Sequence, residues 1–139
     1  MTNVLAAVDG TEGAAKPASF ARDLARRFEA RLTLLHVIEP YPSASLHVFG
    51  VSSSDFYAHQ MGKAREFLRE LVLEIGADEA DQVIEMGVPS EVICHEAEER
   101  DADHIVLGSH GHGKMARIMM GSVAARVTSL TSRTVTIVR

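Results

Sequence analysis

The chain alternates between short apolar runs rich in β-branched residues and longer segments in which apolar positions recur every three or four residues. The first pattern is typical of buried strands and the second of amphipathic helices. Along the 139 residues they predict the element order β-α-β-α-β-α-β-α-β. Strands are expected at Asn3–Val8, Arg31–Val37, Gln82–Met86, His104–Leu107 and Thr134–Val138, and helices at Gly13–Glu29, Asp55–Ile75, Val88–Arg100 and Ser122–Thr131.

Strands that alternate with helices imply parallel crossovers, so we expect an α/β fold with an open sheet, helices on both faces and a single domain over residues 1–139. The segment from Glu39 to Ser54 contains prolines, serines and a glycine, and is expected to be a long loop. The helix that follows it carries an apolar stripe, which we expect in the core. The stripe consists of Tyr57, Met61, Ala64, Leu68, Leu71 and Ile75.

Composition places the chain among ordinary globular proteins, with 46% apolar and 24% charged residues. The single cysteine, Cys94, excludes an internal disulfide framework and a Cys-rich zinc site. No apolar run approaches the roughly 18 residues of a membrane span, so no membrane insertion is expected. The first residues lack the basic flank of a signal peptide, and we expect a cytoplasmic protein.

Charge is unevenly distributed about the net value of −5. Residues 104–139 contain Lys and Arg but no Asp or Glu, whereas all 19 carboxylate side chains lie in residues 1–103. A segment without carboxylates can hold an anion without like-charge repulsion. The acidic remainder argues against nucleic-acid binding, which favours a clearly basic domain.

Two predicted strand ends carry unusual chemistry. The first ends in Ala7-Val8-Asp9-Gly10, and the fourth in Leu107-Gly108 followed by Ser109-His110-Gly111-His112-Gly113. Gly121-Ser122 then opens the last helix. Glycines let backbone N–H groups approach a ligand, and a helix start favours phosphate. Ligands of open parallel sheets bind at the carboxyl ends of the strands, so these segments are candidate phosphate-binding residues.

The spacing Gly108-x₂-Gly111-x₉-Gly121-Ser122 resembles the nucleotide-binding signature of the universal stress protein family. Val4–Asp9 is similar to the first strand of that family, and the resemblance covers essentially the whole chain. It implies a five-stranded parallel sheet of order 3-2-1-4-5, a homodimer formed through the last strand (here Thr134–Val138), and membership of the ATP-binding branch.

The resemblance also implies roles for individual residues. Asp9 would lie near the ribose and phosphates, in part through Mg²⁺, and Val37 would pack on the adenine. Where the family often has Arg or Lys after the second glycine, this chain has His112, so attraction to phosphate there would depend on pH. The complete set of expected nucleotide-binding residues is Ala7, Val8, Asp9, Val37, Leu107, Gly108, Ser109, His110, Gly111, His112, Gly113, Gly121, Ser122 and Val123.

Several alternatives concern the same site. The site would be that of a regulatory module that binds MgATP, of a slow ATPase or phosphotransferase, or of a protein that binds AMP or cyclic AMP. A nucleotide-free dimer that acts through protein contacts is a further alternative. The segment 111–116 also fits a dinucleotide fingerprint, but no acidic residue follows Asp103 to bind a ribose. No P-loop motif occurs.

The remaining histidines and the cysteine support no stronger hypothesis. His110 and His112 lie two residues apart in a loop without a nearby carboxylate, which makes a metal site the weaker interpretation. His36, at a strand end, is expected to be partly buried and hydrogen-bonded. Cys94 and His95 point in different directions on a helix, so Cys94 is interpreted as a packing residue and not as a nucleophile.

Overall fold

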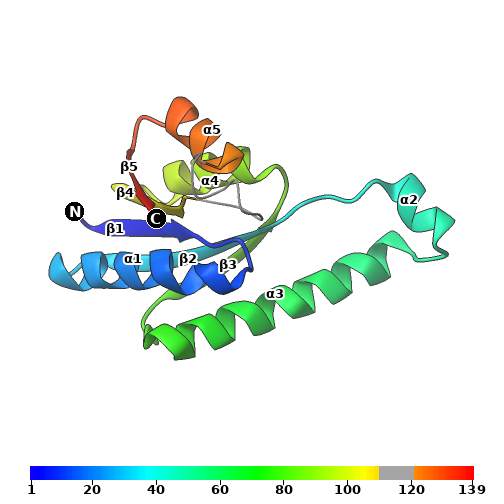
Figure 1. Cartoon of the computed structure of the whole chain (residues 1–139), viewed down its shortest axis with the longest axis horizontal. Coiled ribbons are helices and arrows are strands. Elements are labelled where there is room, and N and C mark those ends of the chain that lie inside the picture. Colours follow the sequence, from blue (N-terminus) through cyan, green and yellow to red (C-terminus); the bar gives the residue numbers. More distant parts are fainter. Residues whose placement is uncertain (110–120) are drawn as a thin grey trace.

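The computed structural model describes residues 1–109 and 121–139 and has an α/β fold (Figure 1). Its five strands form one parallel sheet of order β3-β2-β1-β4-β5, which confirms the expected order. The strands are β1 (Asn3–Ala7), β2 (Arg31–Ile38), β3 (Asp81–Met86), β4 (His104–Gly108) and β5 (Thr134–Val138).

Helices cover both faces of the sheet (Figure 1). On one face lie α1 (Ala15–Arg27), which follows the short 3₁₀ helix η1 (Glu12–Ala14), and α3 (Ser53–Ile75). On the other face lie α4 (Pro89–Glu99) and α5 (Ser122–Leu130). Both faces are covered as predicted, and element ends differ from the predicted ends by one or two residues.

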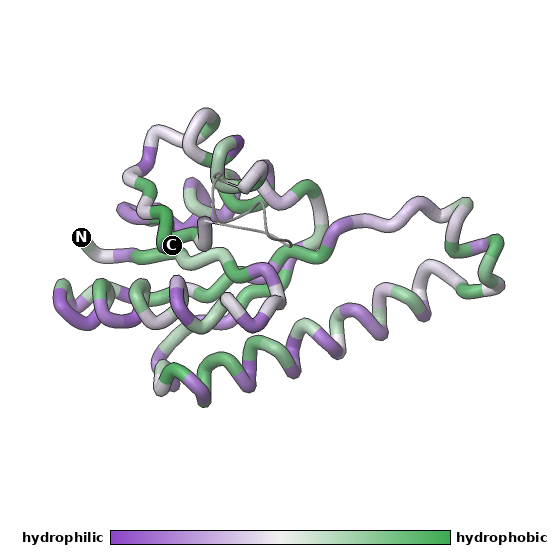
Figure 2. Tube along the Cα trace, viewed as in Figure 1, coloured by the Kyte–Doolittle hydropathy of each residue, from purple (hydrophilic) through white to green (hydrophobic). Residues whose placement is uncertain are grey.

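Neighbouring residues of a strand serve opposite sides of the sheet. In β2, Leu34 packs against α1 and α3 while Leu35 packs toward α4 and α5, and both are fully buried. In β1, Val4 and Leu5 divide in the same way. A strand buried on both faces reads as a continuous apolar run. Figure 2 shows this apolar character along the strands, with polar residues on the outer sides of the helices.

The expectation of a structureless loop over residues 39–54 is wrong, because this segment contains the helix α2 (Ser43–Val48). Pro42 is its N-cap residue, and Leu46 is its only buried residue. A six-residue helix with one buried side chain has no apolar stripe, so periodicity does not reveal it. Val48 and Phe49, at the end of α2, are largely exposed.

The helix α3 begins at Ser53, slightly before the predicted Asp55, because the Ser52 side chain caps it by accepting a hydrogen bond from the Asp55 N–H at 3.2 Å. It ends at Ile75, and the left-handed conformation of the next residue, Gly76 (φ 63°), terminates the helix as predicted.

Only the second half of the α3 stripe belongs to the core. Ala64, Leu68, Leu71 and Ile75 are buried, but Tyr57 and Met61 are half-buried, so the core assignment is wrong for these two. The reason is visible in Figure 1, where the first part of α3 extends beyond the sheet together with α2.

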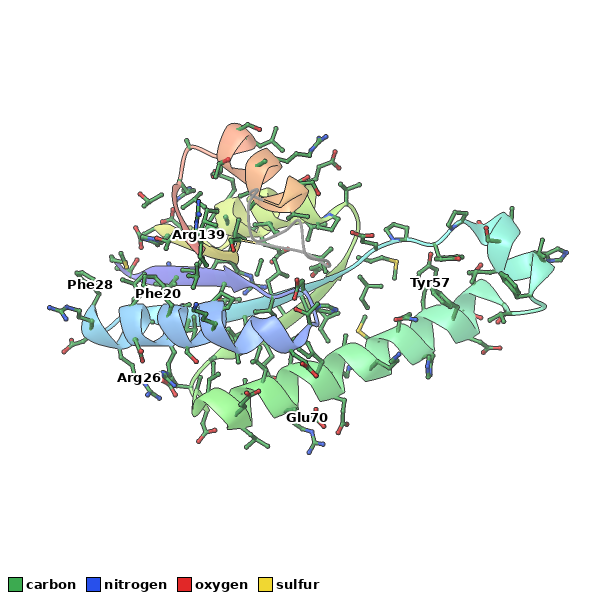
Figure 3. All side chains as sticks on the ribbon, in the orientation of Figure 1. Phe20, Arg26, Phe28, Tyr57, Glu70 and Arg139 are labelled. Atoms are coloured by element: carbon green, nitrogen blue, oxygen red, sulfur yellow. The ribbon has the colours of Figure 1, made fainter. Side chains whose placement is uncertain are left out.

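Two arginines of α1 hold the carboxyl end of α3. The Arg22 guanidinium donates to the carbonyl of Ile75, and Arg26 Nη2 donates to the carbonyl of Gly76 at 2.6 Å. Arg26 also pairs with Glu79 at 2.9 Å, and this contact lowers the pKa of the Glu79 carboxyl. Figure 3 shows Arg26 between the two helices. These bonds satisfy carbonyls that a helix end otherwise leaves unpaired.

Within residues 1–109 and 121–139, no helix combines the length and the apolar composition needed to cross a bilayer.

Candidate functional site

A cavity of about 920 Å³ opens at the carboxyl ends of the central strands. Its walls come from the ends of β1, β2 and β4, from η1 and the start of α1, from the start of α5, and from one side of α3. The volume lies near the upper end of the roughly 300–1,000 Å³ usual for small-molecule sites. Its position is where ligands of open parallel sheets bind.

The turn after β1 forms one wall of this cavity. The Thr11 backbone N–H and hydroxyl both donate to Asp9 Oδ1, at 3.1 and 2.6 Å, which holds the exposed carboxylate in place. Gly10 between them has φ 81°, and a Cβ there would lie 3.2 Å from Cε1 of His36. The turn therefore favours glycine both for its backbone conformation and for the close approach of His36.

His36 supports the same turn from β2. Its Nδ1 lies 2.8 Å from the carbonyl oxygen of Val8, and the imidazole is half-buried. This confirms the expectation of a partly buried, hydrogen-bonded histidine. The bond links the end of β1 to β2 just where the cavity begins.

The start of α5 forms the opposite wall. The Ser109 N–H donates to the Val138 carbonyl at 2.9 Å, and the Ser109 carbonyl accepts from the Gly121 N–H at 2.7 Å. Gly121 is the N-cap of α5 and provides no side-chain cap, so the first turn presents N–H groups without an intrahelical partner. Such a helix start attracts anions.

The structure gathers most of the predicted site residues around this cavity. Ser109 is buried behind the wall, where its backbone bonds to both Val138 and Gly121. Four predicted residues lie outside the described residues: His110, Gly111, His112 and Gly113. The predicted pH dependence at His112 is therefore not tested by the structure. The predicted residues that line the cavity are Ala7, Val8, Asp9, Val37, Leu107, Gly108, Gly121, Ser122 and Val123.

Sequence reasoning missed the part of the cavity wall that comes from α1, α3 and the segment before α2. A lysine on an exposed helix position gives no signal that it faces a cavity, because the facing depends on how the helices dock. The missed lining residues include Lys16, Tyr41, Phe56, Gln60, Lys63 and Phe67.

The metal chemistry of the cavity centres on Asp9. Within the described parts of the chain, no three His, Cys, Asp or Glu side chains cluster in a way that would hold a metal ion. Mg²⁺ commonly takes one or two protein carboxylates and completes its shell with phosphate oxygens and water. The exposed Asp9 carboxylate, fixed through one oxygen by Thr11, fits that mode and no all-protein site.

Cys94 lies away from the cavity lining. Its side chain packs against the apolar cluster under α4 and α5, and burial raises the pKa of its thiol. A raised thiol pKa opposes nucleophilic reactivity. This agrees with the interpretation of Cys94 as a packing residue.

Comparison with known proteins identifies the relatives of this fold. The family model described as "Universal stress protein family" matches residues 1–139. The universal stress protein MJ0531 of Methanocaldococcus jannaschii is 30% identical over 121 residues, which cover 86% of this chain and 71% of that protein.

Solved structures give the same result. Universal stress protein UspA from Lactobacillus plantarum is 26% identical, with a TM-score of 0.83 over 99% of this chain and 97% of that one. The universal stress protein from Archaeoglobus fulgidus, solved in complex with dAMP, is 23% identical, with a TM-score of 0.67 over 100% of this chain and 98% of that one. The chain belongs to the universal stress protein family.

Proposed function

We propose that the protein is a regulatory module that binds an adenine nucleotide, MgATP in the first place, in the cavity at the ends of β1 and β4. The observation that carries the proposal is the arrangement of an uncapped α5 start across the cavity from the fixed Asp9 carboxylate. The relative from Archaeoglobus fulgidus was solved with dAMP, which supports an adenine nucleotide as the ligand class.

The proposed residue roles follow from charge and exposure. The N–H groups of Ser122 and Val123, in the first turn of α5, donate to phosphate oxygens. Val37 and Leu107, which line the cavity from β2 and β4, supply apolar contact for the base. Asp9 accepts from the ribose hydroxyls or holds Mg²⁺, which neutralises phosphate charge when bound.

We also propose that the protein forms a homodimer through β5. This strand is at the edge of the sheet, pairs only with β4 among the described strands, and carries no charged side chain over Thr134–Val138. An uncharged edge strand exposes unpaired backbone groups to a second chain. The hydrogen bond between Ser109 and Val138 joins β5 to the cavity wall. Nucleotide binding would therefore alter the position of this edge strand.

The nucleotide proposal is tested with Gly121→Leu. Gly121 has φ −59°, a backbone conformation open to any residue, and it lines the cavity, so we expect a folded variant with a side chain at the cavity wall, checked by circular dichroism. We expect MgATP affinity to fall by at least about 100-fold in calorimetric titration, since the anion loses its approach to the helix start.

Gly62→Leu is the matched control. Gly62 lies on α3 with open space around it and does not line this cavity. It should bind MgATP as the unsubstituted protein does. Undiminished binding by Gly121→Leu would overturn the assignment of the site.

A further inference from the structure

The cavity consists of two halves, divided by the carboxyl edge of the sheet. Ala7, Val37 and Leu107 line the first half, on the face of the sheet that is covered by α4 and α5. His36 and Phe67 line it on the side of α1 and α3, where Phe67 packs on the core. The signature residues at the start of α5 belong to the first half. Val8 and Asp9, whose turn lies beside His36, adjoin the second half, but its α1 and α3 walls are not among the predicted nucleotide-binding residues.

Aromatic rings form the wall of this second half. His36 and Phe67 pack with their ring centroids 5.3 Å apart and their planes tilted by 58°. Further along α3, Phe56 packs on Tyr41 with centroids 5.7 Å apart. All four residues line the cavity. Aromatic walls of this kind favour flat ring systems, which stack or meet them edge to face.

The position of the outer aromatic pair is fixed by the backbone. The Tyr41 N–H donates to the Tyr57 hydroxyl at 3.2 Å, and Figure 3 shows Tyr57 on the extended part of α3, facing the segment that leads from β2 to α2. Tyr57 in turn packs edge-on against Phe56, with centroids 5.3 Å apart. The contacts hold Phe56 and Tyr41 at the cavity although this part of α3 lies beyond the sheet.

Two lysines line this half, beside the carboxylates of Asp9 and Glu39. Lys16 lines it from α1 and Lys63 from α3. Within the described parts of the chain, neither ammonium group forms a hydrogen bond or an ion pair, although Glu39 lines the same cavity. Two lysines without a protein partner, on two helices that line one cavity, can pair with an anion there.

We infer that the half-cavity between β2, α1 and α3 binds a flat ring system that carries an anionic group. The ring packs against Phe56 and Phe67, and the anionic group lies near Lys16 and Lys63. The ring is either a substituent of the bound nucleotide or a separate molecule beside it. The inference rests on the proposed function only for what fills the other half of the cavity.

The experiment uses 8-anilinonaphthalene-1-sulfonate, a fluorescent ring system with one sulfonate, titrated with and without saturating MgATP. We expect binding that MgATP leaves in place, since the two halves are distinct. Phe56→Ala and Lys63→Glu should each weaken it by about tenfold or more, through loss of ring contact and reversal of charge. Neither residue belongs to the core clusters, so both variants should keep the fold.

The controls are Phe49→Ala and Arg65→Glu. Phe49 is an exposed aromatic residue at the end of α2, and Arg65 is an exposed cation on α3; neither lines the cavity. Both should bind the probe as the unsubstituted protein does. Probe binding that is equally strong in all four variants, or that MgATP displaces completely, would overturn the inference.

A second titration separates the two sources of the ring. N-methylanthraniloyl-ATP carries a flat ring on its ribose. If it binds more tightly than ATP, and Phe56→Ala removes this gain in affinity, the ring in the half-cavity is a substituent of the nucleotide. Equal binding of both nucleotides, with the sulfonate probe still sensitive to Phe56→Ala, assigns a separate molecule. Probe binding of that kind without any MgATP binding supports the inference and overturns the proposed function.

Discussion

Gly10 has a left-handed backbone conformation in the turn that lines the cavity. It has φ 81° between Asp9 and Thr11, and Cε1 of His36 would lie only 3.2 Å from a Cβ at this position. Asp9 was predicted as a nucleotide-binding residue from its place after a strand and from the family resemblance, and it lines the cavity. That His36 completes the turn was not predicted, because the contact joins residues of two different strands.

Gly10→Ala should destabilise the protein by about 1–2 kcal/mol in urea denaturation, the cost of a left-handed backbone for a residue with a Cβ. It should also weaken MgATP binding, because the turn that holds Asp9 shifts. Gly50→Ala is the control: φ is 69° there, but nothing lies within 4 Å. A similar loss of nucleotide affinity in both variants would contradict a specific role of the turn.

Asp103 provides a prediction about acid stability. Its Oδ2 accepts from the N–H groups of Thr2 and Asn3 at 2.7 and 2.9 Å, and these bonds lower the pKa of the carboxyl to about 2. A lowered carboxyl pKa stabilises the fold above the unfolded-state pKa, near 3.9, and this stabilisation is lost as pH falls toward 2.

We therefore expect the stability of the unsubstituted protein to fall between pH 4 and pH 2, and Asp103→Asn to fall less steeply over that range. Glu99→Gln, an exposed carboxylate of α4, serves as the control. Thermal unfolding at a series of pH values makes the measurement. If the melting temperatures of Asp103→Asn and of the unsubstituted protein fall in parallel with pH, the Asp103 carboxylate does not contribute to the acid dependence of stability.

At the scale of elements, the strands and long helices follow from hydrophobic period, because each apolar run lies in a sheet covered on both faces. The helix α2 does not, since it buries only Leu46. The predicted apolar side of α3 is correct, but the burial of its first two positions is not. Periodicity shows which side of a helix is apolar, and it does not show how far the sheet extends beneath that side.

The two halves of α3 should therefore differ in their contribution to stability. Leu68 is fully buried in the core, and Leu68→Ala should cost about 2–5 kcal/mol in urea denaturation. Tyr57→Ala, in the extended half, should cost less than half as much, because Tyr57 is only half-buried and packs on Phe56 beyond the core. Amides near Tyr57 should also exchange hydrogen faster than those near Leu68. Equal losses in the two variants would contradict this division.

At the scale of the whole molecule, the proposed dimer gives a prediction about β5. Thr134→Lys places a cation at the exposed start of the uncharged edge strand, and it would meet the partner chain in a dimer. Sedimentation velocity should show the unsubstituted protein as a dimer and this variant as a monomer with a native circular dichroism spectrum. A dimer of unchanged affinity in the variant would exclude β5 as the interface.

The cavity is likewise a property of the whole molecule, and only part of it was predictable. The predicted residues that line it, among them Asp9, Gly108 and Gly121, come from the predicted strand ends and from the spacing that resembles the family signature. The wall from α1 and α3 was not found, because Lys16 and Lys63 become neighbours of one space only when the two helices pack on the same face.

The most direct test of the account is a calorimetric titration of MgATP, with AMP and cyclic AMP for comparison, into nucleotide-stripped protein. We expect one MgATP per chain with micromolar affinity, or about −8 kcal/mol, and weaker binding of the two monophosphates. A preference for AMP or cyclic AMP would keep the site and contradict ATP as its ligand. Binding of none of the three would contradict the central claim that this cavity is a nucleotide site.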